Sequence, residues 1–118
     1  MPAVHRDIVI EQGAKFVFAV QALHQDKTVF DLTGYSGRMQ VRSNIDDTNI
    51  LVDASTSNGR VSINAPGGIV TVTVGADITA AYTWKTGVYD LEVFTSNPAE
   101  VVRLAEGFAT LSLEVTRP

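Results

Sequence analysis

The stretch from residue 30 to residue 42, FDLTGYSGRMQVR, constrains the fold more than any other part of the chain. Gly34 follows a short apolar run, and after it small or apolar residues alternate with Arg38, Gln40 and Arg42. A period of two is typical of a β-strand, because successive side chains point to opposite faces of the sheet. The stretch therefore predicts a glycine turn that leads into a strand with one buried and one polar face.

The same alternation recurs along most of the chain. A glycine again opens segment 86–94, and the run 69–74 is the richest in β-branched residues, which pack well on a pleated surface. Segment 15–23 is fairly apolar on both of its faces, which predicts that it is covered on both sides. Further strands are expected at 8–11, 50–53, 61–63, 101–104 and 108–115.

One segment departs from the period of two. Ile78 and Tyr82 lie four residues apart and Asp77 precedes them, a pattern that predicts one short helical turn near 76–82 across an end of the fold. About eight strands separated by turn signals are expected of a sandwich. The fold class predicted is all-β, as a single immunoglobulin-like antiparallel β-sandwich over residues 1–118.

Composition narrows the classes of function. The formal net charge is −4, which argues against nucleic acid as a partner, since phosphate binding requires clustered basic residues. Cysteine is absent, so neither disulfides nor thiolate ligands can form. No run approaches the roughly 18 apolar residues of a membrane span, and the first residues lack a signal-peptide core. We expect a soluble protein, made in the cytoplasm, with no membrane contact and no cofactor.

Few side chains have the spacing of catalytic or metal-binding groups. His5 and His24 have no second histidine at ligand spacing and are interpreted as solvent-exposed. Asp46 and Asp47 lie in the polar segment 43–49, which lacks the alternating acids of a calcium loop. We therefore expect an exposed, solvated loop and no metal site.

Asp90 and Glu92 lie two residues apart, so a strand places both carboxylates on one face. Such neighbours can meet the roughly 5 to 10 Å separation of a glycosidase pair. An enzyme would, however, need a concave site that gathers them with shifted pKa values. We interpret them instead as a charged outer face opposite Arg38 and Arg42, two arginines that pair either with this face or with a neighbouring subunit. We expect no enzymatic activity.

Trp84 has two interpretations. It can be an interface anchor, because tryptophan is enriched at binding hot spots. It can also fill the core beneath the short helix, which the sequence slightly favours.

Five short motifs follow one another along nearly the whole chain. They are DIVIEQG (7–13), DLTGYSGRMQVR (31–42), SNGR (57–60), GVYDLE (87–92) and RLAEG (103–107). In this order they resemble a family of small virion proteins of tailed bacteriophages, in particular the immunoglobulin-like N-terminal domain of phage baseplate upper proteins. The resemblance implies a β-sandwich and a virion setting, and brings no catalytic residues. Multidomain relatives carry a long C-terminal extension that this chain lacks, which implies an accessory module.

The predicted function is therefore that of a non-enzymatic virion structural protein, made in the host cytoplasm and located in the virion. It would attach to the tail, baseplate, collar or capsid through contacts with other virion proteins, and symmetric self-association fits such repeated assemblies. Exposed sheet edges and the termini, 1–6 and 116–118, are expected to take part. The interface residues expected are Arg38, Gln40, Arg42, Asp46, Asp47, Trp84 and Arg117.

Two alternatives stay open. One is a capsid decoration (cement) protein that stabilises the phage head. The other belongs to a different class, a carbohydrate-binding module, which predicts exposed coplanar aromatic rings near Tyr82, Trp84 and Tyr89.

Overall fold

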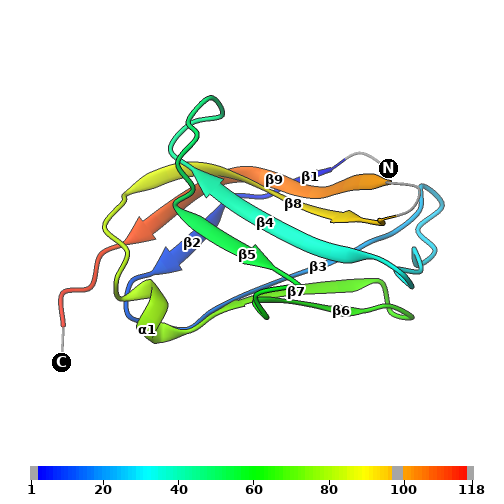
Figure 1. Cartoon of the computed structure of the whole chain (residues 1–118), viewed down its shortest axis with the longest axis horizontal. Coiled ribbons are helices and arrows are strands. Elements are labelled where there is room, and N and C mark those ends of the chain that lie inside the picture. The colour runs from blue at the N-terminus through cyan, green and yellow to red at the C-terminus, as the bar shows by residue number, and fades with distance from the viewer. Residues whose placement is uncertain (1–2, 97–99, 117–118) are drawn as a thin grey trace.

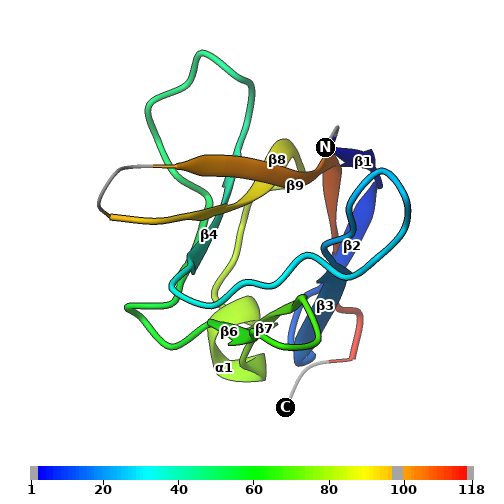
Figure 2. The same ribbon diagram turned by 90° about the vertical axis from the view of Figure 1, so that its right-hand side faces the viewer.

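The computed structural model describes residues 3–96 and 100–116, which form two β-sheets packed face to face (Figure 1). The larger sheet has the strand order β1 (Val4–His5), β9 (Val101–Ser112), β8 (Thr86–Phe94), β4 (Ser36–Arg42) and β5 (Val52–Ser55), and β2 (Ile8–Glu11) also pairs with β9. The smaller sheet has the order β3 (Phe16–Gln21), β7 (Ile69–Val74) and β6 (Val61–Asn64). Figure 2 shows the two layers, with β8 and β9 above β6 and β7. The predicted β-sandwich is confirmed.

The core lies between the two inner sheet faces and follows the alternation of the sequence. Strands β4 and β7 have the bounds predicted for 36–42 and 69–74. Met39 and Val41 of β4 are fully buried, as are Val70, Val72 and Val74 of β7. Each buried side chain of this size stabilises the fold by about 1.5 to 3 kcal/mol relative to exposure.

One predicted feature of the smaller sheet is wrong. Segment 15–23 was expected to be covered on both sides, but Val17 on β3 is 58% exposed. In the described part of the chain, the outer face of the smaller sheet has no covering layer. Valine fits a pleated surface even when solvated, so its presence marks a strand and not burial.

The C-terminal strand also differs from expectation. Strand β9 is continuous where two separate strands, 101–104 and 108–115, were expected. A β-bulge opposite the step from Leu91 to Glu92 shifts its register. Strands β1 and β2 pair with β9 in the parallel sense, while the other strand pairs are antiparallel. Strand β5 begins later than the expected 50–53.

The expected helical turn is present as α1 (Ala76–Thr79), which covers one end of the sandwich (Figure 1). The Thr79 side chain is fully buried. Its hydroxyl donates to the Ala14 backbone oxygen (2.8 Å) and accepts from the Gly13 backbone nitrogen (3.1 Å). This side chain therefore ties the helix to the turn between β2 and β3.

The local backbone geometry explains why glycine occupies both positions that open the predicted strands. Gly34 has φ of +84°, a conformation that side chains with a Cβ rarely adopt. Gly87 lies so close to β4 that an added Cβ would be 2.6 Å from the Arg42 backbone oxygen. The first glycine therefore makes a turn, and the second allows two strands to approach closely.

Candidate functional site on the outer sheet face

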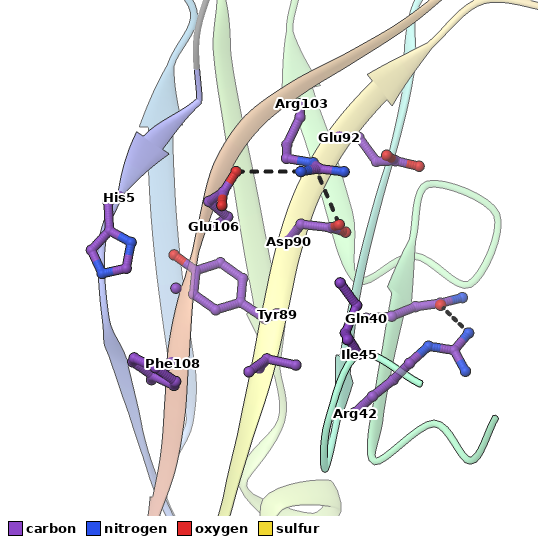
Figure 3. A pocket seen from close by; sticks show the side chains of 12 residues that line it. His5, Gln40, Arg42, Ile45, Tyr89, Asp90, Glu92, Arg103, Glu106 and Phe108 are labelled. Carbon is purple, nitrogen blue, oxygen red and sulfur yellow. Dashed lines mark hydrogen bonds and ion pairs between the residues drawn. The ribbon is translucent and has the colours of Figure 1, made fainter. Parts of the chain in front are cut away.

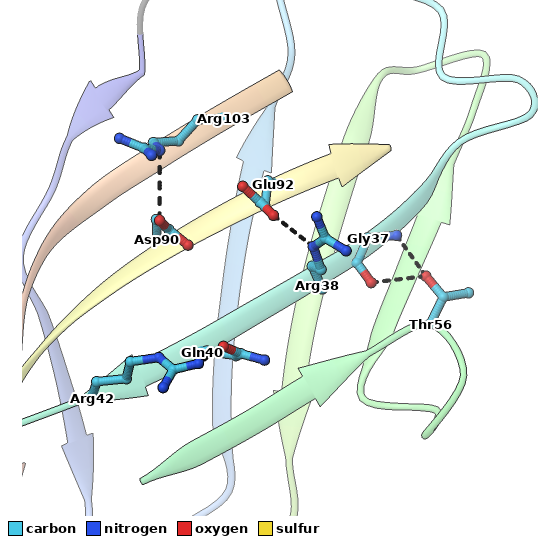
Figure 4. Close-up of polar contacts among 8 residues, drawn as sticks. All are labelled: Gly37, Arg38, Gln40, Arg42, Thr56, Asp90, Glu92 and Arg103. Carbon is cyan, nitrogen blue, oxygen red and sulfur yellow. Dashed lines mark hydrogen bonds and ion pairs between the residues drawn. The ribbon is translucent and has the colours of Figure 1, made fainter. Parts of the chain in front are cut away.

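The outward side chains of β4, β8 and β9 lie side by side in three rows across the larger sheet. Figure 4 shows six of them, namely Arg38, Gln40, Arg42, Asp90, Glu92 and Arg103. The strand register fixes which residues share a row, because directly paired residues point to the same face. The rows are the Arg38 row (Arg38, Glu92 and Arg103), the Gln40 row (Gln40, Asp90 and Glu106) and the Arg42 row (Arg42, Val88 and Phe108).

The Arg38 row contains the shortest ion pair of the face. Arg38 Nε donates to Glu92 Oε1 at 2.6 Å. The guanidinium also lies over the Phe94 ring, 4.4 Å from its centroid, a favourable cation–π geometry. The predicted pairing of Arg38 with the acidic face is confirmed.

Arg103 lies between two carboxylates. Its Nε is 3.5 Å from Asp90 Oδ2, and its Nη1 is 3.4 Å from Glu106 Oε1. Burial raises the pKa of the Asp90 carboxyl and the charge of Glu92 raises it further, while the Arg103 guanidinium opposes the rise. One guanidinium thus serves two acids, so this part of the face keeps an excess of negative charge.

Arg42 was expected to pair with the Asp90–Glu92 face or with a neighbouring subunit, and within the chain it pairs with neither carboxylate. Its Nη2 donates to Gln40 Oε1 (2.9 Å) and its Nη1 to the Asp47 backbone oxygen (2.9 Å). The register explains the difference, because Val88 faces Arg42 on the neighbouring strand and Asp90 faces Gln40.

The segment 43–49 projects from the sandwich between β4 and β5 (Figure 1) and is mostly exposed, as predicted. The Asp47 carboxylate accepts from the Ser43 hydroxyl and from the Asn49 backbone nitrogen. These hydrogen bonds lower the pKa of Asp47, the one from Ser43 most. Asp47 therefore shapes the loop, while the Asp46 side chain stays exposed.

An open groove of about 530 Å³ runs over the three rows (Figure 3). His5 and Phe108 form one side, and Ile45 approaches from the projecting loop on the other (Figure 3). Phe108 is 61% exposed and Ile45 is 85% exposed. The groove therefore combines paired charges with large apolar side chains that are open to solvent.

The sequence interpretation missed Arg103 and Glu106. Residues three apart on a regular strand point to opposite faces. The bulge makes consecutive Leu104 and Ala105 both face the core, and so brings Arg103 and Glu106 onto one face. No local pattern in the sequence marks the bulge. Phe108 was assigned to a strand, and its outward position follows from the alternation with Ala109.

Trp84 lies elsewhere, in the segment between α1 and β8, half-buried and packed against the core. Its ring and that of Tyr82 are 5.9 Å apart at an interplanar angle of 47°. Tyr89 is only 5% exposed. The exposed coplanar rings expected of a carbohydrate-binding module are not formed here. Arg117, the last interface residue predicted, lies outside the described residues.

Within 3–96 and 100–116, no group of three or more histidine, aspartate or glutamate side chains is arranged to hold a metal ion. No helix in that part of the chain is long and apolar enough to cross a membrane.

Comparisons with known proteins do not assign the chain to a family. No protein-family model matches the chain. A search of curated proteins likewise gives no match.

Proposed function

We propose that the chain is a non-enzymatic structural module of a bacteriophage virion, attached to other virion proteins by surface contacts. The observation that carries the proposal is the outer face of the larger sheet, where paired charges lie between the exposed side chains of Phe108 and Ile45. Aromatic side chains are enriched at protein–protein interfaces, and complementary charges add specificity to them. The motif order from residue 7 to residue 107 supports the virion setting by resemblance.

The carboxylates of this face suit recognition better than catalysis. Glu92 accepts a 2.6 Å hydrogen bond from Arg38, and Asp90 shares Arg103 with Glu106. A general acid or nucleophile must be free to exchange a proton or attack a substrate. Here each carboxylate has an arginine partner, as in a docking surface that aligns charges across a contact.

Within this class we propose an accessory position on the tail, baseplate or collar, following the resemblance, with capsid decoration as the second position. Both positions repeat one contact many times by symmetry, which a small sandwich with a docking face can supply. They differ in the number of copies that each particle carries.

Quantitative mass spectrometry of purified particles of the encoding phage tests the proposal. On the order of a dozen copies per particle, a count set by tail symmetry, supports a tail position. A count that matches the major capsid protein supports decoration. If the chain is produced in infected cells but absent from purified particles, the virion proposal is wrong. An abundant intracellular host protein, followed in the same digest, controls for carry-over.

A further inference from the structure

The three rows of the outer face carry no net charge, although the chain does. The three rows contain the arginines 38, 42 and 103 and the carboxylates of Asp90, Glu92 and Glu106, so their charges cancel. The whole chain has a formal net charge of −4. Asp53 on β5 pairs with Gln40 and adds a further carboxylate beside the Gln40 row. The three rows themselves can meet those of a second copy without net repulsion between them.

The charges are also separated along the strands. The Gln40 row contains two carboxylates and no arginine. The neighbouring Arg42 row contains one arginine and no acid, and Arg42 takes part in none of the ion pairs found among the described residues. An acidic row thus lies directly beside a basic one. A face of this kind is complementary to itself when it is shifted by one row.

Apolar groups occupy the same part of the face. Phe108 is 61% exposed and Ile45 is 85% exposed, at the two sides of the groove (Figure 3). Val9 on β2 is 58% exposed and pairs in register with Thr110, two residues beyond Phe108. Burial of such groups supplies most of the free energy of association.

The face is close to the size that a dimer contact needs. The strands of this sheet have between two and twelve residues, and at about 3.3 Å by 4.8 Å for each residue they cover on the order of 600 Å². Stable interfaces bury about 800 Å² on each partner. The sheet face and the adjoining segment 43–49 together approach that area.

We infer that this face is the contact between two copies of the chain. The copies are related by a two-fold axis, so the same residues meet from both sides. A shift of one row places Arg42 of each copy opposite the acidic Gln40 row of the other. The inference concerns the purified protein and does not rest on the proposed virion location. In the particle, a virion protein that docks on this face would take the place of the second copy.

Sedimentation velocity of the full chain over a range of micromolar concentrations is the first test. We expect a reversible monomer–dimer equilibrium. Phe108→Glu is expected to weaken the dimer at least about tenfold, since it places a charge among the apolar groups that the contact buries. Val17→Glu is the matched control, because Val17 has a similar exposed fraction but lies on the smaller sheet. It is expected to leave dimerisation unchanged.

A charge-reversal experiment tests the arrangement itself. Arg42→Glu and Glu106→Arg should each weaken self-association, because each homodimer then contains two repulsive contacts. In an equimolar mixture, a dimer with one copy of each variant restores opposite charges at both contacts. The mixture is therefore expected to dimerise better than either variant alone.

A wild-type chain that stays monomeric at the highest concentration overturns the inference. A dimer that Phe108→Glu does not weaken also overturns it. The same holds if the mixture of Arg42→Glu and Glu106→Arg dimerises no better than either variant alone. Far-ultraviolet circular dichroism of each variant confirms that it is folded. A monomeric chain would contradict the dimer but not the virion proposal, which is tested separately by the number of copies in purified particles. Failure of the one proposal can therefore be distinguished from failure of the other.

Discussion

The Tyr89 hydroxyl donates a hydrogen bond to the Arg6 backbone oxygen at the point where the N-terminal segment passes from β1 to β2. Close by, the Asp7 carboxylate accepts from the Phe108 backbone nitrogen at 3.0 Å. Gly107 leaves room for this crossing, because an added Cβ would lie 2.5 Å from the Arg6 oxygen. These contacts fix β1 against β9 and so place His5 beside Phe108 at the edge of the outer face.

Tyr89 should make stability depend on alkaline pH. Burial raises its pKa from 10.0 to about 12. The folded state therefore disfavours ionisation, so the contribution of Tyr89 is complete below pH 10 and is lost as the pH rises toward 12. We expect the free energy of unfolding to fall by about 1 to 3 kcal/mol over this range.

Urea unfolding, followed by the fluorescence of Trp84, measures this effect. The control is Tyr89→Phe, which should lose about 1 kcal/mol at neutral pH with the hydrogen bond. It should also show a weaker alkaline decline than the wild type. Identical pH profiles for the two proteins would contradict the assigned role of Tyr89.

Thr79 links α1 to the turn at Gly13 and Ala14 through a buried hydroxyl. Thr79→Val keeps the shape but leaves both backbone groups without this partner, which should cost about 1 to 3 kcal/mol. Thr79→Ser keeps the hydroxyl and should cost less. Urea denaturation compares the two variants, and equal losses would show that the methyl group and not the hydroxyl matters.

Gly87 should tolerate no side chain. In Gly87→Ala the new Cβ would be 2.6 Å from the Arg42 backbone oxygen and 2.9 Å from Val41 Cγ1, so the strands must shift. We expect a loss of about 1 to 3 kcal/mol in thermal or urea unfolding. Gly67→Ala is the control, since its Cβ would meet only the movable end of the Asn64 side chain. A control loss equal to that at Gly87 would contradict the steric explanation.

The Arg38–Glu92 pair should contribute modestly. Its side chains are 42% and 20% exposed, so water and salt screen the attraction. A double-mutant cycle with Arg38→Met and Glu92→Gln should give a coupling of about 0.5 to 1 kcal/mol that shrinks as salt is added. In a control cycle that combines Arg38→Met with Glu114→Gln, the two losses of stability should be additive. A coupling that does not respond to salt would point to packing instead of charge.

The strands that could be predicted most closely are those with an unbroken alternation. For β4 and β7 every second residue is buried, so the sequence pattern reports the face and the bounds together. The acidic partner of Arg38 could also be anticipated, because Glu92 lies on a strand of the same pattern. The period of two shows which residues share a face, and this information was sufficient to predict these two strands and the acidic partner of Arg38.

The rest of the outer face depends on pairing between distant segments. The bulge near Leu104 breaks the period of two, so β9 resembles two strands and Arg103 is separated from Glu106 in the pattern. The parallel pairing of β2 with β9 joins residues about a hundred positions apart, and no local signal reports it. Within the chain Arg42 pairs with neither carboxylate of the expected face, because its row depends on the register of β4 against β8.

Density for this chain in a reconstruction of the intact particle tests the central claim most directly. The account predicts a sandwich of this shape at a symmetric position, with Phe108 and the three rows buried against another protein chain. A sandwich whose outer sheet face is open to solvent, while other surfaces make all of its contacts, would contradict the proposed docking face. Particles without the sandwich would contradict the virion assignment itself.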